Sequence, residues 1–277
     1  MESADTLRRK SLELRKDLIA MICAAKTGHV GGSLSSLDIL TVLHYGVLRL
    51  DPKNPSWPGR DRFILSKGHS VEGYYHILAD LGFFPKEELA TYGTFNSRLI
   101  GHPTVKVPGI EMNTGALGHG LSVGVGMALA GKMDGMDYRT FVLMGDGELA
   151  EGSVWEGAMA AAHYGLDRLT AIIDRNRLQI SGDTEKVMRL ESLVGKWREF
   201  GWEAREADGH DFRELAGLFS RVPFAAGKPN LVIANTIKGK DVSFMENIAK
   251  WHHGVPTKEQ METACAELDR MIEGLPA

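Results

Sequence analysis

The run Thr140-Phe141-Val142-Leu143-Met144-Gly145-Asp146-Gly147-Glu148 is the stretch of sequence that decides the fold. Its apolar residues end in an aspartate between two glycines, and a second apolar run, 169–173, ends at Asp174-Arg175-Asn176. A helical stretch at about 153–164 lies between the two runs. Continuously apolar strands joined through helices are typical of a buried parallel sheet, and ligands bind beyond the carboxyl ends of its strands. We therefore predict an α/β protein whose functional residues follow its strands.

The rest of the chain alternates between short apolar runs and helical patterns. We expect helices at about 4–27 (with Gly28 at its end), 36–48, 71–81, 121–133, 212–219 and 258–272, strands at 62–66, 202–206 and 231–235, and a glycine- and serine-rich loop at 29–35. The last helix belongs to a C-terminal tail, 257–277. These elements predict one domain, 1–277, with a mostly parallel central sheet in a three-layer α/β/α arrangement.

Composition excludes several classes of protein. The chain has 277 residues, of which 43% are hydrophobic and 32 are glycine, about 12% against an average of ~7%. A net charge of −4 argues against nucleic acid as a partner, and no apolar run is long enough to span a membrane. The N-terminus lacks the pattern of a signal peptide, and Cys23 and Cys265 form no CxxC pair, so we expect a cytoplasmic protein.

Asp146 and Asn176 form the first candidate site. They lie 30 residues apart, the length of one strand–helix–strand unit, so both should emerge at the same edge of neighbouring strands. A carboxylate, an amide oxygen and a main-chain carbonyl suit Mg²⁺, with water and phosphate oxygens in the remaining positions. Either residue alone is more often part of a turn or a cap. The pair at this spacing favours a metal site.

This Gly-Asp-Gly…Asn pairing resembles the motif that binds thiamine diphosphate (ThDP). The resemblance implies a ThDP-binding fold (a PP module) in which Asp146, Asn176 and the carbonyl of Leu178 hold Mg²⁺, or Ca²⁺ or Mn²⁺ in its place. It also implies that Gly145, Gly147 and Glu148 lie beside the cofactor's diphosphate.

Several histidine-containing segments narrow the resemblance to transketolases. Loops 27–34, 65–70 and 101–103 carry His29, His69 and His102, and look like the substrate-channel loops of that family. Segment 239–254 resembles the end of the same module, where a histidine binds the sugar or the diphosphate; of the doublet His252-His253 we prefer His252. A lone histidine is more often structural, but three in matching loops favour binding and proton transfer to a sugar.

Segment 113–120 resembles the loop that holds the cofactor through its backbone, which implies contacts from Gly115 and Leu117. Ala116 and His119 stand where proline and glutamine are common, which leaves the role of His119 open. Glu151 and Glu156 suit the N-terminal end of a helix. In the resembling family, glutamates at these places link two cofactor sites across a subunit interface.

The resemblance implies a set of site residues. The expected catalytic residues are His29, His69, His102, His252 and Glu151. His69, Glu151, Glu156 and His252 are also expected to contact the cofactor.

The resemblance runs from Thr27 to about Pro256 and points to the N-terminal subunit of a split transketolase. It implies a transferase that moves a two-carbon ketol unit from a ketose phosphate to an aldose acceptor, for instance in the pentose phosphate pathway. It also implies a C-terminal subunit carrying the pyrimidine-binding domain, in an α₂β₂ assembly, without which this chain should be inactive.

Other functions stay open or are disfavoured. A 1-deoxyxylulose-5-phosphate synthase-like subunit, a transketolase for an unusual sugar, and a non-catalytic relative are the alternatives. A nucleotide-binding P-loop at 126–132 lacks its Ser or Thr at 133, and 118–124 is one residue too long for a dinucleotide fingerprint. The aromatic residues Trp197, Phe200 and Trp202 are expected in the core or at an interface.

Overall fold

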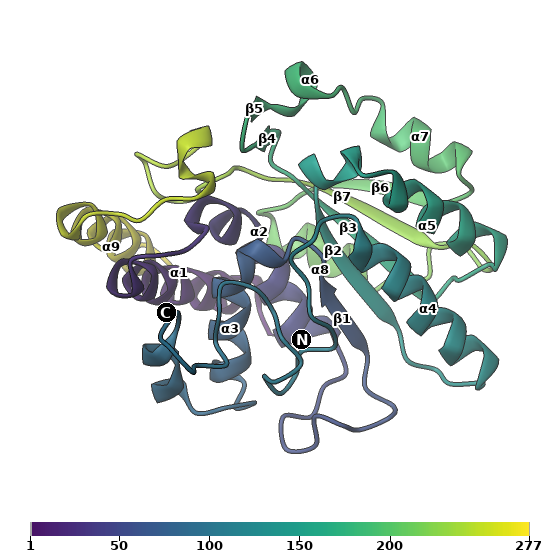
Figure 1. Ribbon diagram of the computed structural model, residues 1–277, viewed down its shortest axis with the longest axis horizontal. Helices are drawn as coiled ribbons and strands as arrows, with labels where there is room; N and C mark the ends of the chain where they lie inside the picture. The colour runs from purple at the N-terminus through teal and green to yellow at the C-terminus, as the bar shows by residue number, and fades with distance from the viewer. Residues whose placement is uncertain (1, 277) are drawn as a thin grey trace.

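The computed structural model describes residues 2–276, and a parallel five-stranded sheet forms its centre (Figure 1). The strands lie in the order β1-β2-β3-β7-β6, and all neighbours pair in parallel. Their bounds are β1 (Arg62–Leu65), β2 (Thr140–Gly145), β3 (Leu169–Arg175), β6 (Glu203–Asp208) and β7 (Asn230–Asn235). This topology confirms the predicted α/β class.

Helices cover both faces of the sheet and complete the three predicted layers. One face carries α1 (Ala4–Ala25), α2 (Val30–Val42), α3 (Val71–Asp80) and α8 (Phe212–Phe219), with α9 (Lys258–Glu273) packed on α1. The other face carries α4 (His119–Met133), α5 (Gly152–His163) and α7 (Leu193–Glu199). Shorter elements are a π-helical turn (Leu43–Val47), 3-10 turns (Gly68–Ser70, Lys86–Thr91, Gly147–Ala150, Ala249–His252), the hairpin β4 (Leu178–Gln179) and β5 (Gly182–Asp183), and α6 (Thr184–Val187).

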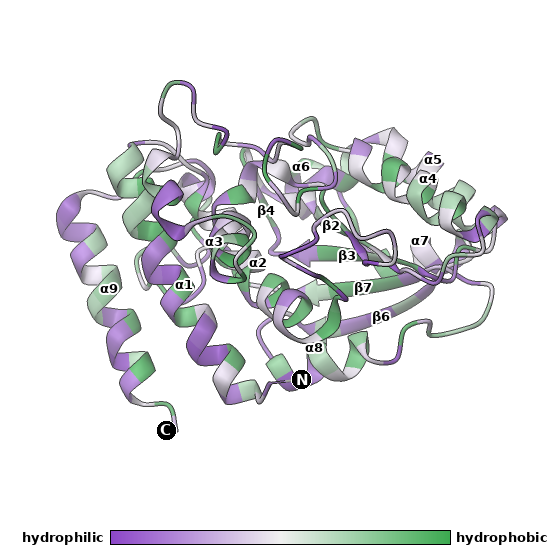
Figure 2. Cartoon of the chain, turned by 90° about the horizontal axis from the view of Figure 1, so that it is seen from below, coloured by the Kyte–Doolittle hydropathy of each residue, from purple (hydrophilic) through white to green (hydrophobic). Residues whose placement is uncertain are grey.

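The strands divide their side chains between two buried clusters. Phe141 and Leu143 of β2 join the cluster under α1, α2, α3 and α8, whereas Val142 and Met144 join the one under α4 and α5. This alternation follows from the two-residue period of a strand, and it explains why the central strands read as continuously apolar. Figure 2 shows β3 and β7 largely hydrophobic, while the outer helix α9 carries both polar and apolar residues.

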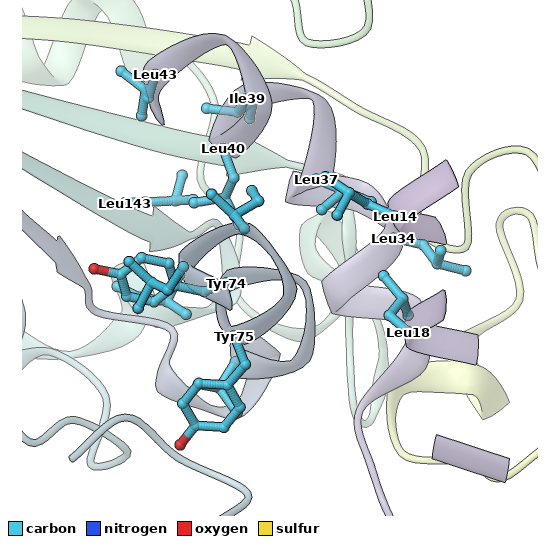
Figure 3. Close-up of a cluster of buried hydrophobic side chains, with 14 of the residues drawn as sticks. Leu14, Leu18, Leu34, Leu37, Ile39, Leu40, Leu43, Tyr74, Tyr75 and Leu143 are labelled. Carbon is cyan, nitrogen blue, oxygen red and sulfur yellow. The ribbon is translucent and has the colours of Figure 1, made fainter. Parts of the chain in front are cut away.

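Helix α2 begins earlier than predicted. The residues expected to form a loop at 29–35 open the helix at Val30, and all of α2 is buried. Small residues are needed there because a Cβ on Gly31 would lie 2.5 Å from the carbonyl oxygen of Trp251. Figure 3 shows the leucines of α2 between those of α1 and Leu143 of β2. Local glycine and serine content misled the prediction, because close packing in the interior selects the same residues as a turn.

Other boundaries differ by a few residues. Helix α1 ends at Ala25, before the expected Gly28, because Lys26 takes a left-handed conformation with φ 56°. Helix α2 ends at Val42, where the π-helical turn replaces the expected helix to 48. Strand β3 continues to Arg175, whose carbonyl oxygen accepts a hydrogen bond from Thr236 N at 3.1 Å.

The rejected motifs lie where the sequence predicted. Residues 126–132 form the body of α4, so they make no P-loop. Trp197 and Trp202 are buried in the cluster under α5, and Phe200 packs against it. Within residues 2–276, no helix combines the length and apolar character that a membrane crossing requires.

Candidate active site

A cavity of about 410 Å³ lies at the carboxyl edge of the sheet. The register that pairs Gly145 of β2 with Asp174 of β3 brings the two strand ends to one level, as the sequence predicted. The lining residues come from loops that follow the strands: Lys67, His69, Leu117, Gly145, Asp146, Gly147, Glu148, Ala150, Glu151, Asn176, Leu178, Gln179, Ile180, Lys238 and His252. The cavity therefore collects ten of the fourteen site residues predicted from the sequence.

Asp146 is the central carboxylate of this cavity. It is 1% exposed; its Oδ1 accepts from Gly147 N at 2.8 Å, and its Oδ2 accepts from Arg177 N at 2.6 Å and from Arg175 at 3.0 Å. Burial, together with the nearby carboxylate of Asp174, raises the pKa of Asp146. A cation bound at this carboxylate would offset that penalty.

The donor set around Asp146 fits a hard divalent cation. The Asn176 amide oxygen, which accepts from Leu178 N at 3.1 Å, and the Leu178 backbone line the same cavity. Within residues 2–276, no group of three or more His, Cys, Asp or Glu side chains is arranged to hold a metal. A mixed set of carboxylate, amide and carbonyl oxygens suits Mg²⁺, because it leaves coordination positions for phosphate oxygens and water.

Two buried lysines face the same cavity, and the sequence analysis missed both. Lys67 follows β1, is 2% exposed, forms an ion pair with Asp174 and donates to the carbonyl of Gly32 at 3.0 Å. Lys238 follows β7 and is also 2% exposed. The available signal was a charged residue shortly after an apolar strand.

Lys238 has no counter-ion. No carboxylate among residues 2–276 lies within 4.0 Å of its Nζ, whose closest polar partner is His252 Nδ1 at 3.4 Å. Burial, with the charge of Lys67 adding to it, lowers the pKa of Lys238 to about 8. An unpaired buried ammonium is costly, so the cavity is prepared for an anion.

Asp174 organises the residues around it, and it too was missed as a site residue. Its fully buried carboxylate accepts from Ser35 at 2.6 Å, from Asn176 Nδ2 at 3.3 Å, and from Lys67 and Thr236. Burial acts to raise the pKa of Asp174, but the charge and hydrogen bond of Lys67 lower it overall. Asp174 therefore holds one cation and orients the amide of Asn176.

The structure brings the three predicted histidine loops together. The His29 ring lies 5.2 Å from that of His69, 6.2 Å from that of His102 and 6.0 Å from that of His252, and the rings of His69 and His252 stack at 5.1 Å. Burial lowers the pKa of His29 to about 4, of His69 to about 2 and of His252 to about 3. These imidazoles are neutral near pH 7, so each can donate one hydrogen bond and accept another.

The doublet is divided between two positions. His252 lines the cavity, whereas His253 is exposed and packs on His29 with ring centroids 4.6 Å apart. His29 Nδ1 is buried without a hydrogen-bond partner, so the cluster retains an unsatisfied polar atom at its centre.

The loop before α4 is tied to the strand ends. A Cβ on Gly115 would lie 2.8 Å from the His102 ring, so this backbone must stay bare. The buried carboxylate of Glu148 accepts from Gly118 N at 2.9 Å, from Gly145 N at 3.1 Å and from Ser66. Burial raises the pKa of Glu148. Glu148 thus connects the loop to the ends of β1 and β2.

The remaining predicted residues lie around the cavity at different distances. Glu151 lines it and caps α5, whereas Glu156 is exposed on α5 and is not part of the lining. His119 is exposed at the start of α4 and also lies outside the lining. His29, His102 and Gly115 belong to the histidine cluster beside the cavity.

Known proteins match this chain along nearly its whole length. The family described as "Transketolase, thiamine diphosphate binding domain" matches residues 9–268. The first of two named subunits of the apulose-4-phosphate transketolase of Phocaeicola vulgatus is 54% identical over 271 residues, covering 98% of this chain and 96% of that protein. The 6-deoxy-6-sulfo-D-fructose transketolase subunit SqwG of a Clostridium species is 42% identical over 265 residues, covering 95% of this chain and 96% of that protein.

Solved structures give the same result. Transketolase from Campylobacter jejuni superposes with a TM-score of 0.90 at 30% identity, covering 97% of this chain but 43% of that one. The fold and the matched residues thus define a thiamine diphosphate-binding domain. The chain belongs to the transketolase family, whose members are transferases that use ThDP, typically with a divalent metal. This confirms the fold and the cofactor implied by the sequence motifs.

Proposed function

We propose that this chain is the diphosphate-binding subunit of a two-component transketolase and acts as one domain over its whole length. Relatives that are named as single subunits of transketolases match it over 96% of their own length, while it spans 43% of the Campylobacter transketolase. A C-terminal subunit with the pyrimidine-binding domain would complete the enzyme, in an α₂β₂ assembly. The free cysteines Cys23 and Cys265 accord with the predicted cytoplasmic location.

The observation that carries this proposal is the pairing of Asp146 and Lys238 in one cavity. A buried carboxylate with a raised pKa favours a metal cation, and a buried ammonium without a counter-ion favours an anion. A metal-bound diphosphate supplies both charges. We assign Asp146, Asn176 and the Leu178 carbonyl to Mg²⁺, and Lys67 and Lys238 to the diphosphate oxygens.

The other residues act on the cofactor and the sugar. Backbone groups of Gly115, Leu117, Gly145 and Gly147 allow close approach of the cofactor, with Glu148 fixing their loops. When bound, ThDP supplies the carbon nucleophile for ketol transfer. His29, His69, His102 and His252, neutral and close together, hydrogen-bond the sugar hydroxyls and exchange protons with its oxygen atoms.

Glu151, which lines the cavity, lies between the cofactor site and the exposed Glu156. We assign Glu151 to the cofactor and Glu156 to contacts with the other chains of the assembly.

The sugar is proposed to be specialised. The relatives named above are transketolases for apulose 4-phosphate and for 6-deoxy-6-sulfo-D-fructose, which favours an unusual ketose phosphate over the substrates of the pentose phosphate pathway. A screen of ketose phosphates against aldose acceptors distinguishes these possibilities, and it also tests a 1-deoxyxylulose-5-phosphate synthase-like reaction, which requires pyruvate.

The site assignment is tested by cofactor retention. The complex with the partner subunit should purify with ThDP and metal, and Asp146→Ala should lose both, because it removes the only charged metal ligand. An Asp134→Ala variant, on the exposed end of α4, is the matched control. Unchanged ThDP and metal content in the Asp146→Ala complex would show that the ligand assignment is wrong.

A further inference from the structure

His210 lies on the loop after β6 and is not part of the cavity lining. Its Nδ1 lies 2.7 Å from Asp38 Oδ2, and its Nε2 lies 2.9 Å from the backbone nitrogen of Ile237. The His210 side chain is 12% exposed and the Asp38 side chain is fully buried. One imidazole thus joins helix α2 to the residue that precedes Lys238.

These two hydrogen bonds fix the tautomer of the ring. A main-chain N–H only donates, so Nε2 accepts from Ile237 and carries no proton. The proton is then on Nδ1, which donates to Asp38. The outer nitrogen is occupied, so this aspartate–histidine pair is not a free general base.

Asp38 is itself held in place by Arg15. Arg15 donates to the two Asp38 oxygens at 2.8 and 2.9 Å. Burial acts to raise the pKa of Asp38, but the charge of Arg15 and the hydrogen bond from His210 lower it overall. The carboxylate therefore stays an acceptor, and the His210 ring has one orientation.

The segment after β7 is held by three backbone hydrogen bonds. Thr236 N donates to Arg175 O at 3.1 Å, and Gly239 N donates to Gly31 O at 3.0 Å. Between them, Ile237 N donates to His210, which is the side-chain anchor of the three. Because no carboxylate holds the Lys238 ammonium, its position depends on this backbone path.

We propose that His210 is a positioning residue for Lys238, holding the Ile237 amide and thereby setting where the lysine ammonium meets the cofactor's diphosphate. This inference rests on the proposed role of Lys238. It assigns to His210 no contact with the cofactor or the sugar.

Two substitutions separate the two hydrogen bonds of the ring. In His210→Asn the side-chain amide overlays Nδ1, so it can still donate to Asp38 but leaves Ile237 N without an acceptor. In His210→Gln the amide oxygen reaches the place of Nε2 and can accept from Ile237. We expect His210→Asn to weaken ThDP binding about tenfold, or about 1.4 kcal/mol, and His210→Gln to stay within about threefold of the wild type.

The experiment titrates ThDP, with Mg²⁺, into the two-subunit complex carrying His210→Asn, His210→Gln, Lys238→Met or the double change His210→Asn/Lys238→Met. If His210 acts through Lys238, the loss caused by His210→Asn shrinks to less than about threefold when Lys238 is already Met. A merely structural histidine would produce the same loss in both backgrounds, which would overturn the inference.

The two levels of the proposal fail in different ways. Weaker binding in Lys238→Met with normal binding in His210→Asn would reject the role of His210 alone. Normal binding in Lys238→Met would reject the diphosphate contact and, with it, the positioning role.

A measurement on the unaltered chain needs no variant to fold. The ¹⁵N chemical shifts of the His210 ring at neutral pH should report a protonated Nδ1 and an unprotonated Nε2. A protonated Nε2 would contradict the bond from Ile237 on which the proposal depends.

Discussion

Replacing Lys238 by methionine should stabilise the cofactor-free protein while weakening its hold on ThDP. Burial and Lys67 lower the pKa of Lys238 from its ordinary value of 10.5 to about 8. At about 1.4 kcal/mol per pH unit, the charged form destabilises the folded state by about 3 kcal/mol at pH 7. Because the folded-state pKa is the lower one, this penalty is complete below about pH 8 and fades as the pH rises toward 10.5.

Methionine has a similar length and no charge, so Lys238→Met removes the penalty. The free energy of unfolding of the cofactor-free chain should rise by about 1–3 kcal/mol, which raises the melting temperature by about 2–4 °C per kcal/mol. The lost charge-assisted contact to the diphosphate should cost about 1.5–3 kcal/mol of binding, or about a 10- to 150-fold weaker Kd.

The assays are thermal unfolding of the cofactor-free chain and calorimetric titration of ThDP with Mg²⁺ into the complex. Lys250→Met, an exposed lysine in the same segment, is the matched control and should change neither quantity. A Lys238→Met chain that is less stable than the wild type, or that binds ThDP normally, would refute the reasoning.

Two further predictions follow from the histidine cluster. Replacing His102 by alanine, beside Gly115 in the cluster, should reduce kcat/KM for the ketose donor by about 10²-fold with ThDP affinity little changed; a normal kcat/KM would remove His102 from the sugar site. Because the folded-state pKa values of His29, His69 and His252 are about 4, 2 and 3, the stability they confer is complete above pH 6.5 and is lost as the pH falls below it. Urea unfolding should show a loss of about 1–3 kcal/mol between pH 7 and pH 5, allowing for solvent screening at half-buried His29 and His252, and a flat profile would contradict the lowered pKa values.

The sequence predicted the fold well because hydrophobic period and strand-following residues are local signals. The end of β2 at Gly145 and the turn at Asn176 were visible in short runs of residues, so the edge that gathers the site could be predicted. The order β3-β7-β6 could not, because it depends on which distant segments pair.

The missed site residues share a different cause. Lys67, Asp174 and Lys238 are ordinary charged residues in the sequence, and their importance comes from burial and from the partners that each has or lacks. A buried lysine without a counter-ion is a property of the tertiary structure. The glycines and serines at 29–35 were misread for a related reason, since dense packing around α2 selects small residues as a loop does.

The claim that this chain is one of two subunits is tested most directly by a ketol-transfer assay with ThDP and Mg²⁺. This chain by itself, the co-purified C-terminal chain by itself and their mixture are compared with the same ketose phosphate donors and aldose acceptors. We predict transfer by the mixture and none above background by either component separately. Full activity from this chain by itself would contradict the account.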